Sequence, residues 1–215
     1  MARAGVNVDL APVADVARPG SFLAADGRAF GSSPGRVAAS AVAFAGGLRE
    51  AGVLATAKHF PGIGAARVST DAAPVRIATP AAALRRVDLR PFRAMIAHGV
   101  PMVMLGTAVH PALDRRAPAA LSRPVVTGLL REELGFRGVT VTDALDTPAL
   151  RPSGGTGPVA VRAVRAGADL VMHTGWADGV TAAGAVRREL RSGGLDRARA
   201  EAAVERVLAM RAGLR

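Results

Sequence analysis

The sequence of 215 residues contains no cysteine and no tyrosine, and aromatic residues make up only 3% of it. The absence of cysteine excludes disulfide bonds and thiolate metal sites, but it leaves the cellular compartment open, because secreted proteins without cysteine are common. The scarcity of aromatic rings leaves few platforms on which single-stranded nucleic acid could stack.

Lysine is almost absent as well, because Lys58 is the only lysine among 28 basic residues. The net charge is +11, yet the arginines are scattered along the expected helices and form no compact basic block. This distribution argues against a nucleic-acid partner. In a chain that uses arginine elsewhere, a single retained lysine is a candidate for a chemical role.

No apolar run reaches the roughly 18 residues that a membrane span requires, so we expect no membrane span. Hydrophobic residues make up 50% and charged residues 21% of the chain, which is typical of a globular protein with a sizeable core. We expect residues 1–215 to form a single domain. The N-terminus has no apolar signal core and leads at once into Val6–Leu10, which has the pattern of a buried strand. We therefore expect an upstream segment to be missing.

Short β-branched runs alternate with amphipathic segments along the chain, which is typical of parallel βαβ units. The predicted strands are Val6–Pro12, Val53–His59, Met102–Leu105, Gly138–Thr142 and Asp169–His173. The predicted helices are Pro34–Ala51, Thr79–Gly99, Val125–Leu134, Pro158–Ala166, Asp178–Arg191 and 196–212. A complete (β/α)8 barrel needs roughly 250 residues. The predicted fold is therefore α/β, a TIM-type (β/α)8 barrel that is incomplete at its N-terminus.

Polar residues follow each of the predicted strands, at the end where barrel enzymes place their sites. Any one of them alone is more often a helix cap or a satisfied core residue, but several at the same end predict a site. They are Asp15, Arg28, Lys58, His59, Thr107, His110, Asp143 and His173.

Six segments resemble motifs of one enzyme family. Lys58–Gly64 (KHFPGIG) is similar to the KHFPGxG signature of family 3 glycoside hydrolases, and Gly5–Val16 is similar to their GxNxDxAPVxDV strand and loop. Further matching segments are Arg28–Gly31, His110–Asp114, Leu134–Asp143 and Ala166–Asp169. They follow the family's order from Gly5 almost to the C-terminus, and they resemble most the bacterial β-N-acetylhexosaminidases.

The resemblance implies a retaining exo-β-glycosidase that removes terminal β-linked N-acetylglucosamine from an oligosaccharide or glycoside by double displacement. It implies that Asp143 is the nucleophile and that Arg28, Lys58 and His59 bind the sugar in the innermost subsite. Lys58 is also the natural cation to keep Asp143 ionised. No cofactor and no metal are expected, because this mechanism depends on two carboxyl groups and the histidines lack metal-ligand spacing.

The acid/base is where the sequence departs from the N-acetylglucosaminidases of the family. Their loop after KHFPGxG carries a histidine in this role, whereas Ala65–Pro74 contains none and has Asp71 at that place. We interpret Asp71 as the acid/base, with a cap of a local turn as the alternative. Ile63 and Ala144 also differ from the usual residues, which bears on N-acetyl specificity.

Three other functions stay open from the sequence. The first is a non-catalytic or degenerate barrel, which would bind sugar without turnover. The second is a β-glucosidase or β-xylosidase, which the lack of a second domain in this chain disfavours. The third, and the least favoured, is a nucleic-acid binder. Relatives act in the cytoplasm on cell-wall fragments or outside the cell as lipoproteins, so the sequence assigns neither a compartment nor an oligomeric state.

Overall fold

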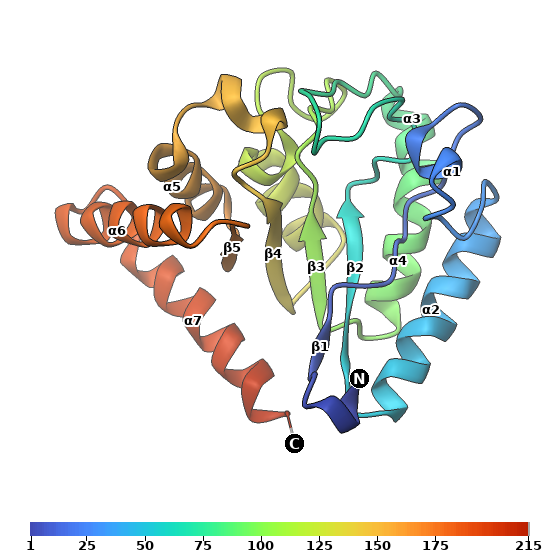
Figure 1. The fold of residues 1–215 in the computed structure, drawn as a ribbon, viewed down its shortest axis with the longest axis horizontal. Coiled ribbons are helices and arrows are strands. Elements are labelled where there is room, and N and C mark those ends of the chain that lie inside the picture. The colour runs from blue at the N-terminus through green and yellow to red at the C-terminus, as the bar shows by residue number, and fades with distance from the viewer. Residues whose placement is uncertain (215) are drawn as a thin grey trace.

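The computed structural model describes residues 1–214 and contains one parallel sheet with helices packed along it (Figure 1). The strands are hydrogen-bonded in chain order, β1-β2-β3-β4-β5. They are β1 (Val8–Asp9), β2 (Leu54–Phe60), β3 (Met102–Leu105), β4 (Val139–Ala144) and β5 (Leu170–Met172). The sheet curls into half of a barrel, which confirms the predicted α/β class and the incomplete barrel.

Helices follow the strands in the predicted order. They are α2 (Pro34–Glu50), the continuous helical stretch of α3 (Ala81–Ala83), η2 (Leu84–Asp88) and α4 (Leu89–Ala97), then η4 (Pro124–Glu133), α5 (Thr156–Ala166), α6 (Trp176–Ser192) and α7 (Arg197–Ala212). Every predicted helix is confirmed, with ends that shift by up to two residues. No helix among residues 1–214 is both long and apolar enough to cross a membrane.

The first strand is much shorter than predicted. Val6–Pro12 was expected, but regular pairing is limited to Val8 and Asp9. Pro12 has no N–H to give to a ladder, and the chain beyond it returns to β2 only through the bridge between Val13 and Lys58. The sequence pattern also missed the short turns of helix, since elements this short show no complete period. These are η1 (Ala2–Ala4), α1 (Phe22–Ala25), η3 (Ala119–Leu121) and η5 (Pro148–Ser153).

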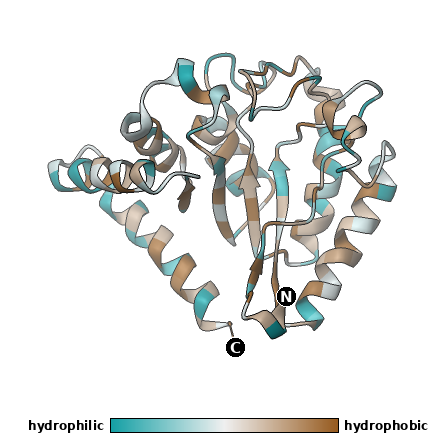
Figure 2. Cartoon of the chain, in the orientation of Figure 1, coloured by the Kyte–Doolittle hydropathy of each residue, from teal (hydrophilic) through white to brown (hydrophobic). Residues whose placement is uncertain are grey.

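The two faces of the sheet are both apolar, as expected for a parallel sheet that is covered on each side. On the outer face, Ala57, Val103 and Leu105 pack with residues of α4 such as Phe92. The inner face is a second cluster formed by Met102, Met104, Val139 and Val141, against which Val207 and Met210 of α7 pack. Figure 2 shows this apolar character along the strands, whereas the helices alternate between apolar and polar residues. Because successive side chains of a strand point to opposite faces of the sheet, alternate residues of each strand face the barrel interior.

One buried carboxylate joins three elements at the N-terminal ends of the strands. The Asp169 side chain is fully buried just before β5 and forms ion pairs with Arg131 of η4 and Arg206 of α7. It also accepts hydrogen bonds from the backbone N–H and the hydroxyl of Thr140 at β4. Because this end of a barrel lies opposite the end that carries active sites, we assign the cluster to stability.

Replacing Asp169 with alanine should therefore lower the free energy of unfolding by about 3–5 kcal/mol, because two guanidinium groups lose their buried counter-charge. Urea denaturation followed by circular dichroism measures this change. The control is Glu201→Ala, which removes the exposed partner of Arg197 and should change stability by no more than about 0.5 kcal/mol. Equal effects of the two substitutions would contradict the assignment.

Candidate active site

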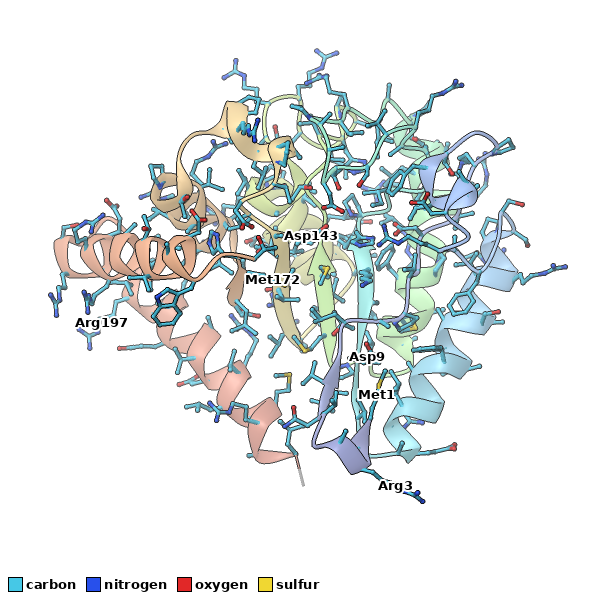
Figure 3. The ribbon with its side chains drawn as sticks, in the orientation of Figure 1. Met1, Arg3, Asp9, Asp143, Met172 and Arg197 are labelled. Carbon is cyan, nitrogen blue, oxygen red and sulfur yellow. The ribbon has the colours of Figure 1, made fainter. Side chains whose placement is uncertain are left out.

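A pocket at the C-terminal ends of the strands is lined by all five residues that the sequence predicted for the site. Lys58 and His59 come from β2 and Asp143 from β4, while Arg28 and Asp71 come from the loops after β1 and β2. Asp143 and its neighbour Met172 of β5 are labelled in Figure 3. The other lining residues are Leu10, Phe22, Ile63, Ser69, Thr70 and Met104. Segments from position 10 to position 172 of the sequence thus meet in one pocket.

Irregular pairing lets two consecutive residues of β2 reach this pocket. Side chains of a regular strand alternate between the two faces, so Lys58 and His59 should point in opposite directions. The register between β2 and β3 shifts between Ala57 and Phe60, and such irregularities redirect side chains next to active sites. A similar shift between Val141 and Ala144 accompanies Asp143 on β4.

Lys58 is repelled by Arg28 and attracted by Asp143 in the pocket. Burial lowers the pKa of Lys58 below its ordinary value, the positive charge of Arg28 lowers it further, and the negative charge of Asp143 raises it. No ion pair within 4.0 Å joins Lys58 to Asp143 in the part of the chain that the structure describes. Lys58 therefore acts on Asp143 through space, and one carboxylate oxygen of Asp143 accepts the backbone N–H of Ala144 at 2.9 Å.

His59 forms hydrogen bonds with a buried carboxylate, that of Asp15, which lies in the loop after β1. The Nδ1 atom of His59 is 2.8 Å from Oδ2 of Asp15, and the backbone N–H of His59 donates to the same oxygen at 3.1 Å. The other oxygen, Oδ1, accepts the backbone N–H of Ile63 at 2.7 Å. Asp15 is among the polar residues predicted at strand ends but had no predicted role; its place inside a matched motif was the signal.

The loop after β1 also lies directly against the turn that follows β2. The backbone N–H of Ala14 donates to the carbonyl of Lys58 at 2.6 Å, and that of Arg18 donates to the carbonyl of Gly64 at 2.8 Å. A Cβ atom on Gly64 would lie only 2.0 Å from the carbonyl oxygen of Val16. Only glycine permits this approach of the two backbones.

A second buried carboxylate, that of Asp88, packs against the same turn after β2. Asp88 of η2 is 2% exposed and pairs with Arg18, whose Nη2 lies 2.9 Å from both carboxylate oxygens. Burial raises the pKa of Asp88 to about 6, although the adjacent Arg18 lowers it. Asp88 lies against Gly62, where a Cβ atom would be 2.9 Å from that of Asp88. Gly62 also has a φ of +123°, which a residue with a side chain rarely adopts.

Asp71 lies on an exposed turn at the edge of the pocket. Its backbone N–H donates to the hydroxyl of Ser69 at 3.1 Å, and this hydroxyl lies 3.3 Å from Oδ2 of Asp71. Asp71 takes part in a local turn and also lines the pocket. Its position is therefore compatible with either alternative, an acid/base or a cap of the turn.

Besides Asp15, three of the polar residues predicted at strand ends are not among the pocket's lining residues. His110 and His173 have buried ring nitrogens without a hydrogen-bond partner in the described chain, and so does the hydroxyl of Thr107. Burial lowers the pKa of His110 to about 4, so its ring is neutral at pH 7. Residues 1–214 also contain no cluster of three or more histidine, aspartate or glutamate side chains that could hold a metal ion.

Comparison with known families agrees with this geometry. The model of the glycosyl hydrolase family 3 N-terminal domain matches residues 1–210. The chain belongs to this family. The family assignment covers the whole half-barrel and every residue that lines the pocket.

Relatives of the family 3 domain include several hexosaminidases. An uncharacterised secreted glycosyl hydrolase of Arthroderma benhamiae is 40% identical over 79% of this chain and 49% of its own length. The β-hexosaminidase LpqI of Mycobacterium bovis is 34% identical over 98% of this chain and 55% of its own length. The chain thus spans about half the length of the curated relatives that it matches.

Solved structures of the family superimpose closely on the domain. A family 3 β-N-acetylglucosaminidase from Paenibacillus gives a TM-score of 0.93 at 36% identity, covering 97% of this chain and 40% of the other. A β-N-acetylhexosaminidase from Beutenbergia cavernae gives 0.88 at 35% identity, covering 97% of this chain and 63% of the other.

The contact between Gly64 and Val16 gives a direct test of the pocket's frame. Gly64→Ala should lower the free energy of unfolding by about 1–3 kcal/mol or more, since the added methyl group overlaps a backbone carbonyl. The matched control is Gly47→Ala within α2, where nothing lies within 4 Å of the new Cβ. This second change should stabilise the protein by about 0.5–1 kcal/mol. Urea denaturation compares the two, and a neutral effect of Gly64→Ala would refute the close approach.

Proposed function

We propose that this chain forms one domain that carries the active site of a retaining exo-β-glycosidase, and that its substrate ends in β-linked N-acetylglucosamine. The observation that carries the proposal is the meeting of Asp143, Asp71, Lys58, Arg28 and His59 in one pocket at the C-terminal ends of the strands. Membership of family 3 and the hexosaminidase relatives support the reaction type and the sugar.

The place of Asp143 on β4 supports its role as the nucleophile. Val139 and Val141 belong to the inner apolar cluster of the barrel, and Asp143 follows two residues later on the same strand, so it continues that face into the pocket. In the first step a carboxylate oxygen of Asp143 bonds to the anomeric carbon while the bond to the leaving oxygen breaks. Lys58 stabilises the negative charge of Asp143 before this attack.

Asp71 lies at the exposed edge, where the leaving group of an exo-enzyme points toward solvent. In the first step its carboxyl proton passes to the leaving oxygen, which departs as an alcohol. In the second step the Asp71 carboxylate takes a proton from water, the water oxygen bonds to the anomeric carbon, and the bond to Asp143 breaks. Arg28, Lys58 and His59 hold the hydroxyl groups of the terminal sugar throughout.

The competing function is a sugar-binding domain without turnover. The hydrogen bonds between Asp71 and Ser69 favour it, because they give Asp71 a structural reason to be present. This alternative predicts that N-acetylglucosamine binds to the pocket but that no glycosidic bond is cleaved.

Replacing Asp143 with asparagine should reduce hydrolysis of 4-nitrophenyl β-N-acetylglucosaminide by at least about 1,000-fold, because no covalent intermediate can form. Release of nitrophenolate measures the rate. Asp26→Asn is the control, since Asp26 is exposed in the loop after β1 and does not line the pocket. Wild-type turnover in Asp143→Asn would exclude Asp143 as the nucleophile, and binding without turnover in the unmodified protein would favour the competing function.

Substrates with different leaving groups distinguish an acid/base role of Asp71 from a purely structural role in the local turn. Asp71→Asn should lower kcat/KM on N,N′-diacetylchitobiose, which reports the first step, by about 100- to 10,000-fold, the usual contribution of a general acid. The loss of kcat/KM on the nitrophenyl glycoside should be much smaller, since nitrophenolate leaves without a proton. Ser69→Ala, which disturbs the turn but keeps the carboxyl, is the control and should affect both substrates alike. If Asp71→Asn keeps full turnover of chitobiose, Asp71 serves only the turn.

A further inference from the structure

Asp15 is a buried carboxylate that contacts a pocket residue without lining the pocket itself. We propose that Asp15 is a positioning residue that fixes His59 in the tautomer with hydrogen on Nδ1, so that Nε2 is a hydrogen-bond acceptor for a hydroxyl group of the bound sugar. The sugar in this statement rests on the proposed function. The tautomer itself rests only on the contacts of Asp15.

The hydrogen-bond pattern around Asp15 determines which nitrogen of His59 carries the hydrogen. Each oxygen of Asp15 already accepts a backbone N–H, from His59 at Oδ2 and from Ile63 at Oδ1. A carboxylate offers only acceptors. The Nδ1 atom, 2.8 Å from Oδ2, must therefore be the donor, and in a neutral imidazole the other nitrogen then has a free lone pair.

The surroundings leave the ring no second orientation. The side chain of Asp15 is 0% exposed and that of His59 is 5% exposed. The same carboxylate holds the ring of His59, its own backbone N–H and the turn at Ile63. A ring flip would replace Nδ1 by a carbon atom and leave Oδ2 without its donor, which is costly for a buried charge.

An acceptor at this position complements the other groups of the pocket. Arg28 and Lys58 can only donate hydrogen bonds, and their positive charges already oppose each other. In the proposed tautomer, with hydrogen on Nδ1 alone, His59 adds an acceptor there without adding a third positive charge. No hydrogen bond to Nε2 exists among residues 1–214, and His59 lines the pocket, so this atom is available to a ligand.

The first test reads the tautomer directly in the unmodified protein. With ¹⁵N-labelled histidine, long-range ¹H–¹⁵N correlation spectra distinguish a ring with hydrogen on Nδ1 from one with hydrogen on Nε2. The signals of His59 are identified by their loss in His59→Asn. We expect the Nδ1–H pattern for His59 near pH 7. The Nε2–H pattern would overturn the proposal, whatever the enzyme's activity.

The second test uses two variants that separate positioning from stability. Asp15→Asn removes the negative charge and places an amide N–H₂ against either the backbone N–H of Ile63 or Nδ1 of His59, so the Nδ1–H signal should shift or change to the Nε2–H pattern. The kcat/KM on the nitrophenyl glycoside should fall about 10- to 100-fold, which is the usual loss for the partner that orients a metal-bound histidine. A His59 ring spectrum that is unchanged in a folded Asp15→Asn protein would contradict the proposal.

His59→Asn keeps an amide N–H₂ near the place of Nδ1 but has no atom at Nε2. We expect it to melt close to the unmodified protein and to lose kcat/KM to the same extent as Asp15→Asn. Wild-type kcat/KM in His59→Asn would refute a role for Nε2. If Asp15→Asn does not fold, this variant and the wild-type spectrum decide the question. If the unmodified protein has no turnover, the proposed function fails while the spectrum still tests the tautomer.

Discussion

The hydrogen bonds of Asp15 are the interaction on which the pocket depends. This one carboxylate ties the loop after β1 to the end of β2, through the backbone of His59 and Ile63 and the ring of His59. A buried carboxylate is tolerated only when such partners surround it. The need to satisfy Asp15 therefore fixes where the turn after β2 lies, and the glycine at position 64 is required because the two backbones then touch.

The Asp169 cluster and the pocket differ in how closely their charges are paired. At the N-terminal end, Asp169 is completely surrounded by donors from Arg131, Arg206 and Thr140, and its charge serves stability. At the C-terminal end, Lys58 and Asp143 influence each other without forming a close pair. A charge that keeps free hydrogen-bonding capacity can act on a ligand, whereas a fully paired one cannot. The same half-barrel thus divides its ionic groups between folding and the proposed chemistry.

The turn that carries Asp71 has an aspartate at the place where the family resemblance predicts a histidine. An aspartate at the pocket edge can exchange protons with a leaving group, and the Ser69 hydroxyl orients its carboxyl. The side chain is exposed, so the protonation needed for an acid depends on what the bound substrate covers. Substrate binding and proton transfer are therefore linked at this residue in the proposed mechanism.

The sequence by itself determined the order of strands and helices, because hydrophobic periodicity and glycine stops are local signals. It also indicated the five pocket residues, since strand ends and family motifs are readable in one dimension. Only the tertiary structure decided how these residues lie. The register shifts that turn both Lys58 and His59 to the pocket depend on the neighbouring strand. The contact of Asp15 with His59 joins residues 44 positions apart, and the ring nitrogens of His110 and His173 are buried without lining the pocket. Such features arise from pairing between distant segments, which no local pattern records.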